Sequence, residues 1–266
     1  MKTAVVYNFD ENYIEYAVTS IYSLCKKYTG SIIDLFCFVT PQMMDMENEI
    51  IGRIGFTNKI NIKFIYSKKF FNLDISIPNT RKHIDSRHIS NQAIQKCFFA
   101  NELKDYDKII YVDPDTLFLE DFNIILNYPM VNKFMAVQEY TYQNYLMYKN
   151  RHMPAFNSGM WIADLNYLRE INFEDLSISY LNSKSMLAFM EQDIFNKFLL
   201  DKWHALPLSF NVFSWTCEDS YWTSYNPEPV MVHFVGSPKP LDDYDFNKDK
   251  CGWAKMFLDI HQETIK

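Results

Sequence analysis

Short apolar runs alternate with amphipathic stretches along the first half of the chain. The runs with the length and composition of strands cover residues 3–7, 32–39, 59–66 and 108–112. The stretches between them have helical character, and they cover residues 13–28, the segment that Pro41 opens, and residues 90–103. Because strands separated by helices pair in parallel, this order predicts an α/β fold with a mostly parallel sheet flanked by helices.

The second half of the chain is less regular but keeps the same kinds of element. Its predicted strands are residues 134–138, 159–163 and 230–234, and its predicted helices are residues 192–200 and a short C-terminal helix within 251–266. No linker rich in Gly, Ser or Pro separates the halves, and no internal repeat is visible. We therefore expect one continuous domain over residues 1–266.

Composition narrows the class of protein and its partners. Of the 266 residues, 48% are hydrophobic and 22% are charged, which suffices for a large core and excludes general disorder. The net charge of −7 argues against a broad surface for nucleic acid or anionic lipid, because both carry negative charge. We expect no nucleic-acid partner.

Cysteine usage and hydropathy predict the compartment. The five cysteines are scattered and form no CxxC pair, which favours free thiols in a reducing compartment. The N-terminus resembles a strand rather than the apolar core of a signal peptide, and the longest apolar run is far too short to span a membrane. We therefore expect a cytoplasmic protein without a transmembrane segment.

The clearest chemical signal is a strand that ends in two carboxylates. Asp113 and Asp115 follow the apolar run 108–112, with Pro114 between them. Open α/β sheets bind ligands at the carboxyl ends of their strands, and two such carboxylates can converge on Mg²⁺ or Mn²⁺. Asp and Pro also favour simple turns, so these residues alone leave a plain turn open. A phosphatase of the haloacid-dehalogenase type would need its threonine one position later than Thr116.

If this chain binds a phosphate group, it does so without the usual glycine-rich loops. The six glycines form neither GxGxxG nor GxxxxGK[ST]. Three later segments offer polar groups instead, namely FNSGM at 156–160, EQD at 191–193 and HFVGSPK at 233–239. Each segment alone is compatible with an ordinary structural role, such as a helix cap, a buried histidine or a surface lysine.

Taken together and in order, these segments resemble the signatures of family 8 glycosyltransferases. The signatures are hhhxxDxNY at 5–13, DxD at 113–115, FNxG at 156–159, QD at 192–193 and HxxGxxKP at 233–240. This family is a retaining group of the GT-A fold that includes bacterial lipooligosaccharide galactosyltransferases and glycogenin. The resemblance covers about residues 3–240 and implies a single Rossmann-like GT-A domain. Its halves would be nucleotide-binding at about 1–115 and sugar-binding at about 116–240, followed by a C-terminal extension at 241–266.

The resemblance implies a metal cofactor and a UDP-sugar donor. Asp113, Asp115 and His233 would hold Mn²⁺, with Mg²⁺ as the alternative ion, and Pro114 belongs to the same segment. The remaining donor contacts would come from groups that line the uridine or cradle the diphosphate. Asn8, Asp10 and Asn12 would line the uridine, Tyr13 would stack on uracil, and Gly236 and Lys239 would cradle the diphosphate.

The resemblance also implies how the sugar is held and transferred. Lys96 would hold Asp113 or a sugar oxygen, Asn157 would contact the donor sugar, and Gln192 would lie beneath the anomeric carbon. An amide at that position favours front-face attack, in which the departing phosphate takes the acceptor proton, and Glu191 is the alternative nucleophile. This chain departs from the family at two positions. The family usually has Asp where this chain has Glu191, and Trp where this chain has Leu241, so the identity of the transferred sugar is open.

Acceptor contacts are less well defined by the sequence. Residues 87–90 resemble an acceptor-binding stretch, and the aromatic residues within 210–225 either contact the acceptor or fill the core. No basic, aromatic tail follows the C-terminal helix, so membrane docking is not expected.

The function predicted from the sequence is metal-dependent, retaining transfer of a hexose, glucose or galactose, from a UDP-sugar to a saccharide or glycolipid acceptor. Cell-surface polysaccharide or lipooligosaccharide synthesis is the expected setting. Two alternatives stay open. One is a nucleotidyltransferase acting on sugar phosphates, although residues 8–13 contain no glycine for the loop it would need. The other is a catalytically silent protein that binds a nucleotide sugar.

Overall fold

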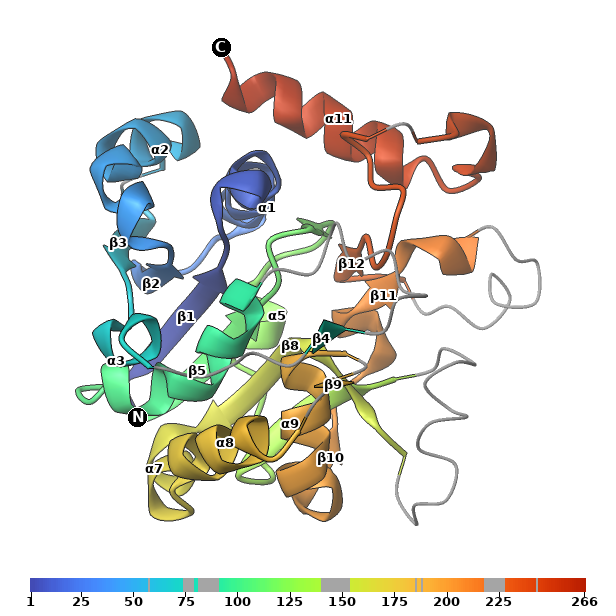
Figure 1. Cartoon of the computed structure of the whole chain (residues 1–266). Coiled ribbons are helices and arrows are strands. Elements are labelled where there is room, and N and C mark those ends of the chain that lie inside the picture. Colours follow the sequence, from blue (N-terminus) through green and yellow to red (C-terminus); the bar gives the residue numbers. More distant parts are fainter. Residues whose placement is uncertain are drawn as a thin grey trace.

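A seven-stranded sheet forms the centre of the protein (Figure 1). The computed structural model describes residues 1–56, 58–73, 79–80, 91–139, 154–184, 186–187, 189–217, 228–242 and 244–266. The strand order is β10-β7-β8-β5-β1-β2-β3. The strands are β1 (Thr3–Asn8), β2 (Ile33–Phe38), β3 (Ile60–Ile65), β5 (Lys108–Val112), β7 (Phe134–Gln138), β8 (Phe156–Asp164) and β10 (Trp203–Ala205).

Most neighbouring strands of this sheet run in the same direction. β1 pairs in parallel with β2 and β5, β2 with β3, and β7 with β10. β8 is the exception, because it is antiparallel to both β5 and β7. The predicted α/β fold with a mostly parallel sheet is confirmed.

Two small sheets accompany the central one. The first joins β6 (Thr116–Phe118), β11 (Val212–Phe213) and β12 (Met231–His233), with β12 in the middle. The second pairs β4 (Asn79–Thr80) with β9 (Met186–Leu187). β12 runs antiparallel to β6 and places His233 opposite Thr116. This pairing was not expected from the sequence, and it brings the two halves of the candidate site together.

Helices and 3-10 turns connect the strands. The α-helices are α1 (Ile14–Lys27), α2 (Glu47–Ile54), α3 (Lys68–Phe71), α4 (Phe99–Glu102), α5 (Asn123–Leu126), α7 (Leu165–Glu170), α8 (Phe173–Asn182), α9 (Glu191–Leu199) and α11 (Trp253–Thr264). The 3-10 segments are η1 (Glu11–Tyr13), η2 (Pro41–Met46), η4 (Asn91–Phe98), η5 (Leu200–Lys202), η6 (Leu208–Phe210), η7 (Ser214–Cys217) and η8 (Phe246–Lys248). The helix expected over residues 90–103 is therefore mostly a tighter 3-10 segment, η4, followed by the short α4.

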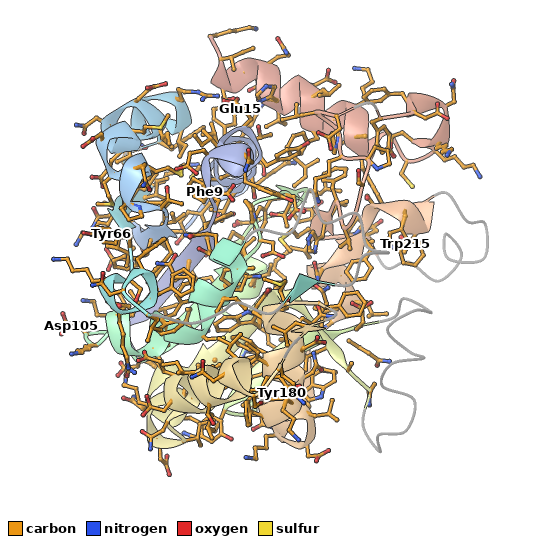
Figure 2. The ribbon with its side chains drawn as sticks, in the orientation of Figure 1. Phe9, Glu15, Tyr66, Asp105, Tyr180 and Trp215 are labelled. Carbon is orange, nitrogen blue, oxygen red and sulfur yellow. The ribbon has the colours of Figure 1, made fainter. Side chains whose placement is uncertain are left out.

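Apolar side chains fill both faces of the central sheet (Figure 2). Along β1, Val5 and Tyr7 join one core while Ala4 and Val6 join the other, because successive strand residues point to opposite faces. α1 and α2 cover the first face, and α7, α8 and α9 cover the second (Figure 1). A third apolar cluster lies between α11, α1 and the small sheet that contains β12.

The strand directions explain where polar residues gather. β1 and β5 are parallel neighbours, and Val6 lies opposite Tyr111, so both strands end at the same edge of the sheet. β8 runs the other way, so it begins near the point where β5 ends. Side chains that follow β1 and β5 therefore meet side chains at the start of β8.

The cysteines correct one expectation. Cys25, Cys37 and Cys97 are free and buried, but Cys251 is disulfide-bonded, so the prediction of free thiols throughout is wrong. The cytoplasmic location that rested partly on this argument stays a prediction. Among the described residues, no helix is both long enough and apolar enough to cross a membrane.

Candidate functional site

A cavity of about 690 Å³ opens at the edge where β1 and β5 end. Its size is in the range of small-molecule and cofactor sites. Nearly all the residues singled out from the sequence line it. They are Asn8, Asp10, Tyr13, Lys96, Asp113, Pro114, Asp115, Asn157, Glu191, Gln192, His233, Gly236 and Lys239.

The segment after β1 departs in part from the sequence expectation. Asn12 is exposed and does not line the cavity, and its backbone N–H donates to Asp10 Oδ1 at 3.0 Å as the cap of η1. Asn8 lines the cavity, but its side-chain amide exchanges hydrogen bonds with Gln92, at 2.8 Å to the backbone carbonyl and 3.1 Å from the side chain. Gln92 was missed by the sequence argument, since a glutamine in a helical pattern carries no distinguishing signal.

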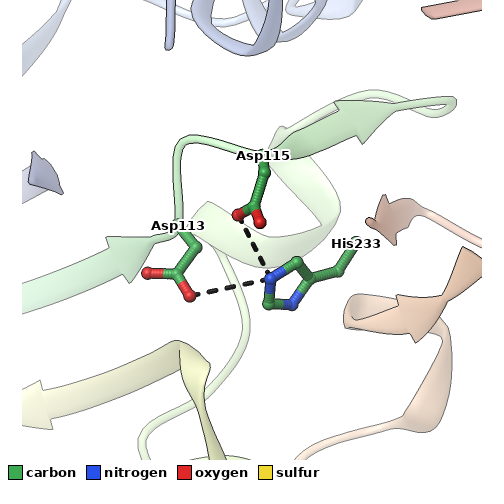
Figure 3. A group of neighbouring side chains, drawn as sticks. All are labelled: Asp113, Asp115 and His233. Carbon is green, nitrogen blue, oxygen red and sulfur yellow. Dashed lines mark ion pairs between the residues drawn. The ribbon is translucent and has the colours of Figure 1, made fainter. Parts of the chain in front are cut away.

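Two carboxylates and an imidazole converge beside the cavity (Figure 3). Asp113 follows β5, Asp115 precedes β6, and His233 ends β12. The Nε2 atom of His233 lies 3.2 Å from Asp115 Oδ1 and 3.6 Å from Asp113 Oδ2. One ligand atom from each residue lies within 4.8 Å of the others, which is close enough for one metal ion to bind all three.

The orientation of the imidazole suits a metal ligand. Its Nδ1 lies 2.9 Å from Asn211 Oδ1, and the Asn211 amide donates in turn to Asn157 Oδ1 at 2.9 Å. This chain of bonds turns the Asn211 carbonyl toward the ring, so Nδ1 is a donor and Nε2 faces the two carboxylates, where a bound cation would take its lone pair. Three acceptor atoms that face one another fit a divalent cation, and a mixed set of oxygen and imidazole ligands suits Mn²⁺ or Mg²⁺ better than Ca²⁺.

Gly159 is required by the position of the imidazole. A Cβ atom at residue 159 would lie 2.3 Å from His233 Cε1 and 2.7 Å from Nδ1, far inside van der Waals contact. We therefore expect Gly159→Ala to displace the His233 ring and to weaken Mn²⁺ binding roughly 10- to 100-fold, the usual effect of disturbing the groups that orient a ligand. Titration calorimetry with Mn²⁺ measures this directly.

Gly52 provides the matched control for that substitution. It lies in α2, and apart from its chain neighbours and the backbone of its own helix, no described atom lies within 4 Å of a Cβ placed there. Gly52→Ala should leave Mn²⁺ binding unchanged and raise stability by about 0.5–1 kcal/mol, because alanine favours helix. Equal Mn²⁺ affinity in both alanine variants would contradict the assignment of His233 as a ligand.

A buried lysine joins the metal cluster to α9. Lys96 Nζ donates to Asp113 Oδ1 at 2.8 Å and to Glu191 Oε1 at 2.7 Å. Burial alone would lower the pKa of Lys96, but the two carboxylates outweigh it and raise the pKa above its usual value. Burial raises the pKa of Glu191 more than Lys96 and the Ser158 hydroxyl lower it. Lys96 therefore carries its charge permanently and fixes both carboxylates.

A second lysine meets the other metal-site carboxylate. Lys239 Nζ donates to Asp115 Oδ2 and, at 2.7 Å, to the backbone carbonyl of Phe234. Burial acts to raise the pKa of Asp115, but the attraction of Lys239 and His233 outweighs it and holds the pKa far below its usual range. The preceding turn depends on Gly236, which has φ of +84° and so a backbone that favours glycine.

Gln192 is tied into the cavity wall rather than left free. Its Oε1 accepts from the backbone N–H of Ser158 at 3.0 Å and from Asn157 Nδ2 at 3.2 Å. Its Nε2 lies 3.5 Å from Glu139 Oε2, which also accepts from Asn157. Glu139 and Ser158 were missed by the sequence argument, because Glu139 lies outside the recognised motifs and Ser158 occupies the variable position of the FNxG signature.

Several acceptor predictions fall outside the described residues. These are residues 87–90, Tyr221, Trp222 and Tyr225. Phe213 is fully buried, and its ring centroid lies 5.9 Å from that of His233, so it serves the core rather than an open surface. Leu241 packs at the edge of the cluster that contains α11, and its backbone N–H donates to the Tyr16 hydroxyl at 3.3 Å.

Comparison with solved structures identifies the fold family. The structure superposes on the galactosyltransferase LgtC, solved with donor and acceptor sugar analogues, with a TM-score of 0.76 and 18% identity over 97% of this chain and 95% of LgtC. It also resembles WbbM, a bifunctional glycosyltransferase, with a TM-score of 0.72 and 19% identity, covering all of this chain and 52% of WbbM. The protein therefore has the GT-A glycosyltransferase fold.

Sequence comparison agrees with the fold. General stress protein A of Bacillus subtilis (strain 168) is 27% identical over 226 residues, which are 74% of this chain and 78% of that protein. Glycosyltransferase GlyF of Streptococcus pneumoniae serotype 4 is 22% identical over 165 residues, which are 59% of this chain and 39% of GlyF. The sequence pattern of glycosyl transferase family 8 matches residues 4–244, and the chain belongs to this family.

Family membership sets the general chemistry. It implies a nucleotide-sugar donor and a saccharide acceptor, and enzymes of this fold use a divalent metal. The cluster of Asp113, Asp115 and His233 is a candidate site for that metal.

Proposed function

We propose that the protein is a metal-dependent, retaining glycosyltransferase that moves a hexose from a UDP-sugar to a saccharide acceptor. The observation that carries this proposal is the convergence of Asp113, Asp115 and His233 at a cavity that Lys239 also lines. A divalent ion held by these three side chains would supply positive charge where the diphosphate leaving group becomes more negative.

The chain's own residues would bind and orient the donor. Lys239 would meet the diphosphate with an ammonium charge, and the open turn at Gly236 would let backbone approach the phosphates. Tyr13 lines the same cavity, with its ring centroid 5.8 Å from Lys239 Nζ, so a base stacked on the ring would leave its phosphates near the lysine. Asn157 lines the same cavity, where it would contact the donor sugar.

The placement of the acidic groups favours front-face attack over a covalent intermediate. A retaining double displacement needs a carboxylate free to attack the anomeric carbon. Glu191 is held by Lys96 at 2.7 Å and by the Ser158 hydroxyl at 2.9 Å, both through Oε1, and Gln192 offers only an amide whose oxygen is already bonded. We therefore propose that the departing phosphate takes the acceptor proton while Glu191 and Gln192 shape the floor under the sugar.

The finer identity of the substrates rests on the relatives. LgtC is a galactosyltransferase, so we propose a hexose, galactose or glucose, and a saccharide or glycolipid acceptor of cell-surface polysaccharide or lipooligosaccharide synthesis. We propose that the reaction takes place in the cytoplasm. We also propose that residues 1–115 bind the nucleotide, that residues 116–240 bind the sugars, and that residues 241–266 form an extension.

Thermal unfolding tests the donor and the metal together. UDP and Mn²⁺ added together at about 100 times their dissociation constants should stabilise the protein by about 2.7 kcal/mol. In a chain of this size such a gain raises the melting temperature by roughly 5–10 °C. Adenosine diphosphate with Mn²⁺ is the control for base selection and should give a smaller shift. No shift with UDP and Mn²⁺ in a well-folded protein would rule out the proposed donor.

A further inference from the structure

The ammonium group of Lys239 lies beside the candidate metal cluster, where it contacts Asp115. Its side chain is 3% exposed, and it forms an ion pair with Asp115 through Oδ2, while Asp115 Oδ1 faces His233 at 3.2 Å. Nζ has a third hydrogen, for which no acceptor is found among the described residues. The lysine also lines the cavity. A lysine ammonium thus contacts one of the proposed metal ligands and lines the space for the donor.

Lys96 is bound in a different way, although it also contacts a metal-site carboxylate. Its ammonium joins Asp113 to Glu191, and it lies 4.5 Å from the centroid of the Tyr111 ring. If Asp113 were shared with a metal ion, Lys96 would still have a full negative charge at Glu191. Among the described residues, the Lys239 ammonium contacts no second carboxylate, since its other acceptor is the backbone carbonyl of Phe234. Of the two lysines, Lys239 is therefore the one whose single counter-charge, within the part of the chain that the structure describes, is a proposed metal ligand.

We propose that the Lys239 ammonium neutralises Asp115 when no divalent cation is bound, and that it moves to the diphosphate when the donor binds. The divalent cation and the diphosphate would therefore bind cooperatively. The inference rests on the proposed function, because it takes the cluster of Asp113, Asp115 and His233 as the metal site. It goes further than the proposed function because it assigns to Lys239 the control over metal retention.

The physical reason is repulsion between like charges in a buried site. A divalent ion on Asp115 Oδ1 and an ammonium on Oδ2 of the same carboxylate repel each other strongly where water is largely excluded. The metal alone therefore binds weakly. A diphosphate supplies the negative charge that accepts the ammonium, so the repulsion is relieved and both ligands gain affinity by the same factor, as linkage requires. The metal would then be retained only together with a donor or a nucleoside diphosphate product.

Titration calorimetry with Mn²⁺, in the absence and presence of saturating UDP, tests this inference. In Lys239→Met, the affinity for Mn²⁺ alone should rise at least about tenfold, or 1.4 kcal/mol, because the competing charge is removed. The gain in Mn²⁺ affinity on adding UDP should fall at the same time. Lys239→Gln is the second neutral variant, since its amide can still donate to Asp115 and Phe234 if the methionine variant does not fold.

Two further variants separate charge at this position from net charge. Lys239→Arg keeps the cation and should bind Mn²⁺ alone as weakly as the wild type. Lys255→Met removes the same charge from an exposed site on α11, where the lysine pairs with Asp259, and should also leave the Mn²⁺ affinity unchanged.

The outcomes distinguish this inference from the proposed function. Suppose that the wild type binds Mn²⁺ in the presence of UDP, but the neutral Lys239 variants bind Mn²⁺ alone no more tightly than the wild type does. That result would overturn the role of Lys239 and leave the metal-site assignment intact. Tighter Mn²⁺ binding in the neutral variants and not in Lys255→Met would establish it. Absence of Mn²⁺ binding in every protein, with and without UDP, would overturn both proposals.

Discussion

Asp115→Asn should lower the rate of UDP-sugar turnover at least about 100-fold, equivalent to about 2.7 kcal/mol of transition-state stabilisation. The substitution removes one of the two carboxylates in the candidate metal site and exchanges a charged ligand for a neutral one. It also leaves the buried Lys239 ammonium without its counter-charge. Release of UDP from UDP-glucose and UDP-galactose, with Mn²⁺ and a range of saccharide acceptors, measures the effect.

Asp164→Asn is the matched control for this substitution. Asp164 caps the first turn of α7 through Oδ1 and lies away from the cavity, and asparagine caps helices about as well as aspartate. Turnover should therefore be close to wild type in Asp164→Asn. The metal assignment would fail if Asp115→Asn, shown to be folded by circular dichroism, kept more than about a tenth of the wild-type rate.

The strands were predictable because their signal is local. β1, β2, β3, β5 and β7 follow apolar runs or alternations that a short window detects, and the structure places them within one or two residues of the expected bounds. The reversed direction of β8 is a long-range property, since it depends on which strands it lies between. β6 and β10 have three residues each, too few for a pattern to be distinguished from a turn.

The candidate site divides in the same way. Asp113 and Asp115 stood out because two carboxylates follow the end of an apolar strand, whereas His233, Lys239 and Lys96 were identified through the family resemblance. The other groups that support them were not identified. Asn211, which orients the imidazole, lies outside every recognised motif, and its role arises only where β11 pairs with β12.

Asn12 belongs to the hhhxxDxNY signature, but it is exposed and does not line the cavity, so its contact with uridine stays a prediction. Asp10 of the same signature lines the cavity and also uses a carboxylate oxygen to cap η1. A signature residue can thus stabilise the local turn as well as face the site. Tyr13, one position after Asn12, lines the cavity because η1 turns the chain there.

The two buried lysines of the site neutralise different carboxylates. Each contacts one metal-site carboxylate, but Lys96, which lies on η4, also pairs with Glu191 at the start of α9. Glu191 thus links the start of α9 to the end of β5 through a single ammonium group. The position of Glu191 in the cavity wall depends on that link, and its removal provides the second large effect expected in this protein.

Lys96→Met should destabilise the fold by about 3–5 kcal/mol, because the buried carboxylates of Asp113 and Glu191 would face each other without a counter-charge. The melting temperature should fall by roughly 10 °C. The loss should be smaller at about pH 5 than at about pH 8. A carboxyl group whose folded-state pKa is raised, as that of Glu191 is, gains stability as the pH falls through that pKa.

The double variant Lys96→Met/Glu191→Leu separates the ion pair from simple packing. Replacing both partners of a buried pair with apolar side chains of similar volume is often neutral for stability, so the double variant should recover most of the lost melting temperature. It should not recover turnover, because Glu191 and the fixed position of Asp113 are both lost. A double variant as unstable as Lys96→Met would mean that the lysine stem, and not its charge, stabilises this part of the protein.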